Sequence, residues 1–593
     1  NNLGHPLCDH LRSGTWALDY TVNRLRPYAD MYPTLEPLIQ WFTERFALIR
    51  KVPNFLLPKY FALTIHTAYE ASVHKAVSLM APFVAHGDPF IQRLALCSVQ
   101  LHSTVHSTAL HPNQSGPSLA AGLTHFATAH MRCWGRDVFI SLPGLLLTTG
   151  NFEAARTHIL AFASSLRHGL IPNLLDANRH PRYNARDAAW WFLQAVQDYC
   201  QRAPEGLALL ETPVARRFPS TDEFVTPDDP RAYAETAPLA DIIQEILSRH
   251  ANGIHFREWN AGPELDHAMQ DAGFQIDIFT DWTTGFIHGG NEHNCGTWMD
   301  KMGDSAKAGI LGKPATPRDG APVEITGLVK STLRWLAQLS ASGKFPHRGV
   351  KVQNDSADGD GSRFVTYADW DQLIQRTFET HYYIPSETDA SANDQAAAVV
   401  EPHPELINRR GIYKDTVGGS RPFANYQLRP NYSVALVVAP ELFHPRRAIE
   451  AVLAVKDHLL GPLGLKTLDP IDWAYRGIYD NTNDSEDATV AHGINYHQGP
   501  EWLWVTGYFL RAWLHFAPLA HQASRAETAN NISEGIILLA HKTMISTSPY
   551  AGLPELTNEN GQFCAGSCTT QAWSSATILS FLEDLAAVNE QAE

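Results

Sequence analysis

Apolar side chains recur every three or four residues along most of this chain, which is the spacing of one buried helical face. In residues 445–461 the apolar stripe consists of Ile449, Val452, Val455 and Leu459, and the segment opens with Pro and ends at Gly, as helices commonly do. The same spacing predicts helices over residues 36–50, 58–80, 93–106, 151–167, 187–201, 239–250, 324–341, 369–381 and 532–545, and another from Pro500 through Trp513.

Long loops separate these helices, and most of them are rich in Gly, Asn, aromatic and charged residues. Loops of this length in a compact domain are usually functional or disordered, and their aromatic content favours ordered, functional loops. Residues 353–363 and 386–404 are polar instead, which is typical of a mobile surface. Alternating patterns that indicate hairpins occur only near 273–280 and 345–353.

This organisation predicts an all-α fold in which helical pairs surround an axis and the loops at one end form a pocket. Periodicity alone does not distinguish such a toroid from stacked helical layers. No repeat with a period of 20–50 residues is visible, which disfavours the common solenoids.

Composition narrows the function further. The 593 residues are 44% hydrophobic and 18% charged, with a net charge of −16, so nucleic acid and anionic membranes are poor partners while a neutral sugar is compatible. No apolar run approaches the ~20 residues of a membrane span. The first residues lack a basic segment followed by an apolar stretch, so we expect no secretory signal and a cytoplasmic protein.

The cysteine pattern supports the same compartment. Seven cysteines in a chain of this length are typical of reduced, mostly buried thiols. Cys564 and Cys568 are four apart but have no neighbouring Cys or His pair to complete a zinc site. We therefore expect no metal.

Two loops combine adjacent Arg and Asp with aromatic residues, a set suited to gripping sugar hydroxyls under an aromatic face. In the first, Arg136 and Asp137 follow Trp134; a buried ion pair that fixes the loop would explain them equally well.

The second loop repeats the theme before a predicted helix. It contains Tyr183, Asn184, Arg186 and Asp187, although Asp187 alone would also serve as a helix cap. The recurrence of the theme indicates a carbohydrate site more strongly than either loop does by itself.

Carboxyl groups suited to acid–base chemistry occur in two further loops, since glycoside hydrolysis needs a pair of them. Asp300 lies beside Trp298 and Lys301, and an indole in a dehydrated pocket raises the pKa of a neighbouring carboxyl. The alternative to a catalytic acid is that Asp300 forms a surface ion pair with Lys301. Glu555 and Glu559 share a loop near the C-terminus, and side-chain chemistry alone does not choose between them as the base.

Other polar and aromatic residues in loops are candidates for the pocket wall. For His497 and Glu501, a role in hydrogen bonding at the pocket wall is favoured over capping of the predicted helix that begins at Pro500. The candidates are Arg429 and Asn431 in one loop, Tyr496, His497 and Glu501 in the next, and Trp573 before the last helix. The chain lacks the nucleophile elbow of esterases, the phosphate loop of nucleotide hydrolases and the glycine fingerprint of dehydrogenases.

At these blocks the sequence closely resembles the amylo-α-1,6-glucosidase domain of eukaryotic glycogen debranching enzymes. The similar motifs keep their order over residues 40–590 and include CWGRDVFI, YNARDAAWW, HNCGTWMDKMG, ATPRDGAPVEI, YQLRPNYSVAL, NYHQGPEWLW and GLPELTNENG. The resemblance implies an (α/α)6 toroid of six inner and six outer helices and an inverting mechanism without a cofactor. It assigns the general acid to Asp300 and the base to Glu555, with Glu559 as the fallback, and places Arg136 and Asp137 on the glucose of the catalytic subsite.

The resemblance also implies partners and domains. The substrate would be glycogen or a branched α-glucan, and a 4-α-glucanotransferase half would precede this part in the full-length protein. We expect residues 1–110 to form a helical linker subdomain and residues 111–593 the glucosidase domain. A glucoamylase-like toroid enzyme and a non-catalytic glycogen-binding scaffold are the alternatives.

Overall fold

The computed structural model describes residues 14–105, 115–353, 361–387 and 401–592. The chain divides into two compact units, Asn1–Met80 and Ala81–Glu593. The centres of the two predicted mobile stretches, 353–363 and 386–404, lie outside the described residues. The functional boundary at residue 110 stays a prediction.

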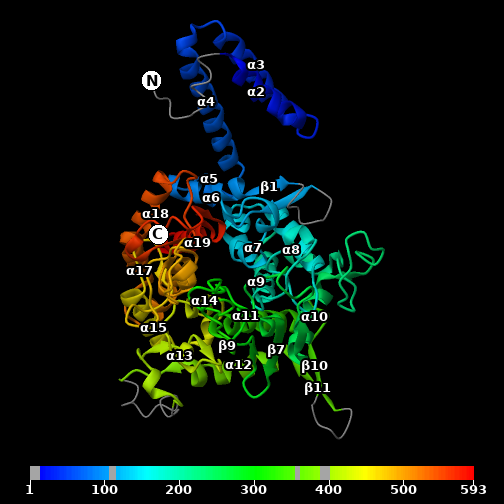
Figure 1. The fold of residues 1–593 in the computed structure, drawn as a ribbon, viewed down its shortest axis with the longest axis vertical. Coiled ribbons are helices and arrows are strands. Elements are labelled where there is room, and N and C mark those ends of the chain that lie inside the picture. Colours follow the sequence, from blue (N-terminus) through cyan, green and yellow to red (C-terminus); the bar gives the residue numbers. More distant parts are fainter. Residues whose placement is uncertain (1–13, 106–114, 354–360, 388–400, 593) are drawn as a thin grey trace. The chain divides into compact units, whose positions relative to one another are not determined.

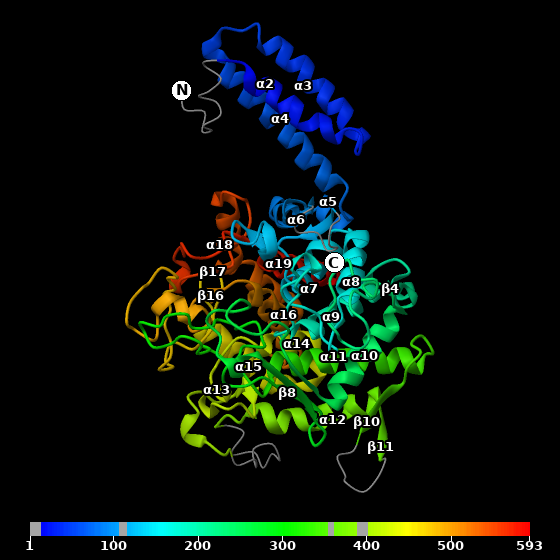
Figure 2. The same cartoon turned by 45° about the vertical axis from the view of Figure 1, so that its right-hand side comes forward.

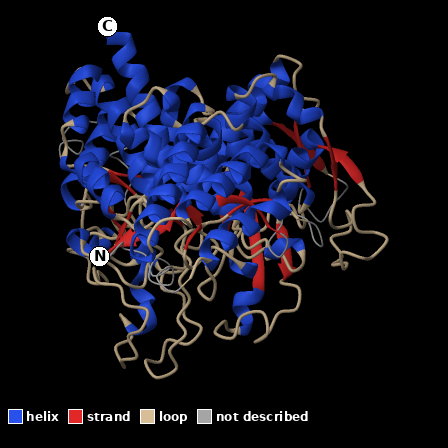
Figure 3. Cartoon of the chain, turned by 90° about the horizontal axis from the view of Figure 1, so that it is seen from above, coloured by secondary structure: helices blue, strands red, loops and turns tan. Residues whose placement is uncertain are grey.

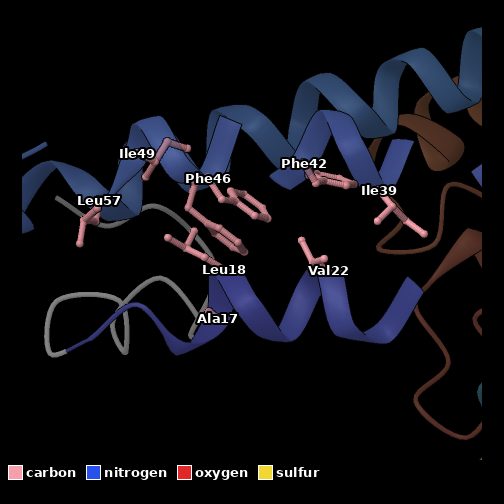
Figure 4. Packing of buried hydrophobic residues seen from close by; sticks show 9 residues of the cluster. Ala17, Leu18, Val22, Ile39, Phe42, Phe46, Ile49 and Leu57 are labelled. Carbon is pink, nitrogen blue, oxygen red and sulfur yellow. The ribbon is translucent and has the colours of Figure 1, made fainter. Parts of the chain in front are cut away.

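The first unit is a small helical bundle. Its helices are α2 (Trp16–Leu25), α3 (Glu36–Ile49) and α4 (Leu57–Ser78). Figure 4 shows their apolar side chains meeting between α2 and α3, where Leu18 packs with Phe42 and Phe46. The rings of Phe42 and Phe46 stack with centroids 5.3 Å apart. The predicted helices 36–50 and 58–80 are therefore present within two residues of their expected ends.

Six helices of the second unit form a closed circuit of contacts. Each packs on the next, and the last packs on the first; Figure 1 shows five of them, α7, α9, α11, α14 and α19, around the middle of this unit. The six are α7 (Gly135–Leu142), α9 (Ala188–Arg202), α11 (Val323–Ala341), α14 (Tyr432–Val438), α16 (Trp504–Leu519) and α19 (Ala572–Ala592).

Further helices pack against the members of this circuit. α6 lies on α19, α8 on α9, α12 on α11, α15 on α16, and α17 on both α16 and α19. Their bounds, with those of the remaining helices, are α5 (Pro82–Ala85), α6 (Pro89–Leu101), α8 (Phe152–Ser164), α10 (Leu239–Asn252), α12 (Tyr367–Tyr382), α13 (Pro422–Asn425), α15 (Pro445–His458), α17 (Arg525–Ser533) and α18 (Ile536–Thr547).

Short strands within the loops form antiparallel pairs. Within the described ranges they pair as β1 (His102–Val105) with β2 (Gly116–Leu119), β3 (Gly122–Leu123) with β18 (Thr570–Gln571), β4 (Pro213–Ala215) with β5 (Thr236–Pro238), β9 (Ala321–Pro322) with β14 (Thr416–Val417), β10 (Gly349–Gln353) with β11 (Ser362–Thr366), and β12 (Tyr383–Ile384) with β13 (Ile412–Tyr413). Two three-stranded sheets contain β6 (Ile254–Arg257), β7 (Gln275–Asp281) and β8 (Phe286–Gly289), and β15 (Leu465–Lys466), β16 (Glu501–Trp502) and β17 (Leu556–Thr557). The two expected hairpins correspond to β7 with its neighbours and to β10–β11, which projects from the helices in Figure 2.

Most of the strands and long loops lie along one side of the helices in Figure 3. One sequence prediction fails there: the helix expected from Pro500 begins at Trp504, because Glu501 and Trp502 pair with the strands on both sides of them. The helix expected over 93–106 likewise ends at Leu101, where β1 begins. Among the described residues, no helix combines the length and apolar character needed to cross a membrane.

Candidate active site

A cavity of about 260 Å³ lies where α7, α9, α16 and α19 begin. Residues from six separate stretches of the chain line it, so the fold rather than local sequence assembles the site. The lining residues are Ala121, Phe126, Trp134, Arg136, Asp137, Asn173, Leu174, Arg182, Asn184, Ala185, Asp266, Met269, Cys295, Trp298, Asp300, Met302, Tyr496, His497, Trp502, Glu555, Gln571 and Trp573.

Arg136 links Asp300, which lines the cavity, to Asp187, which lies behind the cavity wall. Its Nε and Nη2 atoms donate to the two carboxylate oxygens of Asp187 at 2.7 and 2.9 Å, and its Nη1 atom donates to Oδ2 of Asp300 at 3.0 Å. Arg136 and Asp187 are buried, whereas 39% of the Asp300 side chain stays exposed to the cavity. The pKa of Asp300 is raised because the cavity walls remove water from the carboxyl, and Arg136 opposes that rise.

Asp137 is a second buried carboxyl of the cavity. Gln571 donates from Nε2 to Oδ1 of Asp137 at 3.0 Å, which joins the first turn of α7 to the end of β18. Burial raises the pKa of Asp137 to about 7, Arg136 lowers it, and the charges of Glu555 and Asp300 raise it further. Asp137, Asp300 and Glu555 therefore lie close enough for the charges of Asp300 and Glu555 to raise the pKa of Asp137.

Glu555 enters the cavity from the loop that precedes β17. The pairing of β17 with β16 fixes this loop, and the backbone N–H of Cys568 donates to Oε2 of Glu555 at 3.3 Å. Burial raises the pKa of Glu555 to about 7; the hydroxyl of Tyr496 and the N–H of Cys568 stabilise the carboxylate, and the charge of Asp300 disfavours it.

Glu559, the alternative base, lies outside the cavity lining. Its Oε2 atom accepts a hydrogen bond from the hydroxyl of Tyr475 at 2.9 Å, and its backbone N–H donates to Gly477. Geometry therefore favours Glu555 over Glu559 for a role in the cavity.

Aromatic rings form one wall of the cavity. Trp298 contacts His497, Trp502 and Trp504 edge-on, with centroid distances of 5.1–5.2 Å, and Trp573 stacks on Trp504. The pKa of His497 lies well below its ordinary value because the ring is buried, so the ring is neutral.

Several polar atoms of the same wall are buried without a hydrogen-bond partner among the described residues. They are both ring nitrogens of His497, Nε1 of Trp573 and Oε1 of Gln571.

Seven of the predicted site residues do not line the cavity. Three of them support lining residues: Asp187 holds Arg136, Asn431 accepts from Nε1 of Trp298 at 2.8 Å, and Arg429 donates to the backbone of His497 at 2.9 Å. These three buried side chains lie behind the wall.

The other four have different neighbours. The Tyr183 hydroxyl donates to the backbone of Ser165, Arg186 donates to the backbone of Arg318 at 2.6 Å, Lys301 donates to Asn481 at 3.3 Å, and Glu501 accepts from Thr557 and from the backbone of Gly561. Lys301 thus forms no surface pair with Asp300 in this structure.

Sequence reasoning missed other lining residues, among them Phe126, Asn173, Arg182, Asp266 and Gln571. Asn173 accepts from the backbone N–H of Arg136, and Arg182 donates to Asp266 at 3.3 Å. Arg182 directly precedes Tyr183, and Gln571 lies two residues before Trp573. This proximity to predicted site residues was the feature of the sequence that could have indicated them.

Comparison with known proteins shows the family to which the chain belongs. The family described as amylo-alpha-1,6-glucosidase matches residues 88–580, which is most of the chain. The chain belongs to the amylo-α-1,6-glucosidase family. This confirms the predicted family and the predicted class of enzyme, a glycoside hydrolase.

Similarity to glycogen debranching enzymes extends beyond the residues that this family model matches. Residues 1–25 match the central domain of human glycogen debranching enzyme. The glycogen debranching enzyme of Saccharomyces cerevisiae is 49% identical over 591 residues, which is 99% of this chain and 38% of the yeast protein. The chain therefore spans less than half the length of that relative.

Proposed function

We propose that this chain removes single α-1,6-linked glucose residues from branch points of glycogen or a similar α-glucan. The observation that carries the proposal is the meeting of Asp300 and Glu555, from loops 255 residues apart, in one small cavity. An aromatic wall and Arg136 line the same cavity, and a sugar ring can stack its apolar face on such a wall. The name of the yeast relative supports glycogen as the substrate.

The closed circuit of six helices supports the (α/α)6 toroid. In this arrangement α7, α9, α11, α14, α16 and α19 are the inner helices, and α6, α8, α12, α15 and α17 belong to the outer layer. The cavity would then lie at the end of the ring where the inner helices begin. A 4-α-glucanotransferase half in the full-length protein and a cytoplasmic location also stay predictions.

The mechanism we propose is acid–base hydrolysis with inversion. Asp300 gives its proton to the glycosidic oxygen as the bond to C1 breaks, and Glu555 takes a proton from the water that attacks C1 from the opposite face. Glucose leaves as the β anomer, Asp300 ends ionised and Glu555 ends protonated, and exchange with solvent resets both groups. An inverting pair needs about 6.5–9.5 Å between its carboxyl groups to admit this water.

The electrostatics of the cavity are compatible with these roles. Burial raises the pKa of Asp300, which favours the protonated form that an acid needs. A general base works best with a pKa near the working pH, and that of Glu555 is about 7.

Glucose release tests the reaction and its specificity. The chain should release glucose from an α-1,6-glucosyl-cyclodextrin, and proton NMR should detect β-glucose first. Slow action on maltose separates this enzyme from a glucoamylase-like one. Binding of glycogen without glucose release would support the scaffold instead, and α-glucose as the first product would contradict inversion.

A substrate with a good leaving group tests the two roles separately. Fluoride needs little protonation to leave, so Asp300→Asn should retain far more activity on α-glucosyl fluoride than on the glucosyl-cyclodextrin. Glu555→Gln should lose activity on both, because each reaction needs an activated water. The reverse pattern would exchange the two roles.

A further inference from the structure

A second cavity, of about 310 Å³, adjoins the catalytic pocket and takes no part in the proposed chemistry. Its lining combines aromatic and polar side chains: His180, Trp259, Arg182, Glu258, Asn260 and Glu264 are among them.

Trp259 is an exposed but firmly supported ring. Its side chain is 43% exposed, and one face stacks on Phe224 with ring centroids 3.6 Å apart and planes at 12°. The guanidinium of Arg167 lies 5.7 Å from the Phe224 ring centroid and supports that ring in turn. The His180 ring lies parallel to Trp259 within 6°, at a centroid distance of 6.0 Å. The result is an ordered aromatic platform open to solvent.

Arg182 connects this platform to the catalytic pocket, because it lines both cavities. It donates to Glu258, next to Trp259, at 2.9 Å, and to Asp266, which lines the catalytic pocket, at 3.3 Å. The two ion pairs tie the 258–266 loop to the rim of the pocket. A chain of sugars that leaves the pocket past Arg182 therefore meets the platform next.

We propose that Trp259 and His180 form a binding platform for the α-glucan chain that carries, as a single α-1,6-linked branch, the glucose in the catalytic pocket. The proposal rests on the proposed function, since it takes the bound chain to be the polymer from which glucose is cut. The apolar C–H face of a glucose ring stacks on the indole. Asn260, Glu264 and Arg182 offer hydrogen-bond partners to its hydroxyl groups.

The test uses the intact chain, Trp259→Ala, Trp259→Phe and a control, Phe364→Ala. Phe364 is a 61% exposed aromatic residue on β11 and lines neither cavity. Retardation in a native gel containing dissolved glycogen gives the affinity for the polymer, and hydrolysis of α-glucosyl fluoride reports on the catalytic pocket and on folding.

Trp259→Ala should bind glycogen about tenfold more weakly, which corresponds to ~1.4 kcal/mol, and hydrolyse α-glucosyl fluoride at the wild-type rate. Trp259→Phe and Phe364→Ala should bind nearly as the wild type does. Equal retardation of Trp259→Ala and wild type, or no retardation of the wild type, would overturn the platform. Failure of the wild type to hydrolyse the fluoride would instead count against the proposed function, and the gel would still decide the platform.

Discussion

The Nη1 atom of Arg136 lies 3.0 Å from Oδ2 of Asp300, so the first turn of α7 holds a carboxyl group that stands 164 residues further along the chain. Two further hydrogen bonds fix the same guanidinium to Asp187. Arg136 is therefore both an anchor for Asp300 and a positive charge that favours its ionised form.

Removal of Arg136 should change the pH dependence of the reaction as well as its rate. Arg136 lowers the pKa of Asp300, so Arg136→Gln should raise that pKa. Because the acid is active when protonated, the alkaline limb of kcat/KM should move to higher pH, while misplacement of the acid lowers the rate by about 10². Arg409→Gln, which breaks an ion pair with Asp469 outside the cavity lining, is the control. An unchanged alkaline limb would contradict the proposed role of Asp300.

Tyr496 should control the acidic limb. Its hydroxyl stabilises the ionised form of Glu555, so Tyr496→Phe should raise the Glu555 pKa above its value of about 7. A base is lost as pH falls through its pKa, and the acidic limb should therefore move to higher pH. A pH profile of kcat/KM measures the shift; movement in the opposite direction would exclude Glu555 as the ionised base.

Arg318 should be important for stability. It is buried and donates to Glu324 at 2.7 Å and to Asp415 at 2.6 and 3.0 Å. Arg318→Met removes the guanidinium from Glu324 and leaves Asp415 with Asn431 and the more distant Arg429, so it should lower the free energy of unfolding by ~3–5 kcal/mol in urea titrations.

The stability loss in Arg318→Met should depend on pH. Burial raises the pKa of Glu324 and Arg318 opposes that rise, so the folded-state pKa of Glu324 should rise further without the guanidinium. Protonation of Glu324 at low pH therefore relieves the loss, which should grow as pH rises. Arg334→Met provides the comparison: its ion pair with Glu441 is partly exposed, so we expect about 0–1 kcal/mol. Equal losses in the two variants would contradict this account.

Gly144 marks a close contact between the segment after α7 and α19. A Cβ atom at this position would lie 2.0 Å from the backbone oxygen of Ala576. Gly144→Ala must push the two elements apart and should cost ~1–3 kcal/mol of unfolding free energy. Gly14→Ala, whose Cβ would meet nothing nearer than 3.8 Å, should be neutral.

The helices were predictable because their apolar stripes are long. Val452, Val455 and Leu459 repeat through several turns, and α15 begins at the predicted Pro445. The paired segments around Glu501 and Leu556 contain two residues each, too few to show any period, so their strands were missed. These short pairings fix the loops that carry the site.

The candidate site was predictable where the side-chain type and the family motif indicate the same role, as at Arg136 and Asp300. Arg186 shows the limit: it has the same Arg-Asp context as Arg136, yet its side chain is buried against glycines of the 289–296 loop. Tertiary packing decides whether the side chain of a loop residue faces the cavity or the protein interior. The sequence of the loop alone does not show which of the two it faces. Arg182, in contrast, lines the cavity, although the sequence predicted Tyr183 and Arg186 as site residues instead.

Glucose release from an α-1,6-glucosyl-cyclodextrin by wild type, Asp300→Asn, Glu555→Gln and Glu559→Gln tests the central claim most directly. Acid–base groups each supply about 10²–10⁴ in rate, so the first two substitutions should slow release by several hundredfold or more. Glu559→Gln should act like the wild type, because Glu559 bonds Tyr475 outside the cavity lining. Near-normal release by Glu555→Gln, together with loss in Glu559→Gln, would contradict the assignment.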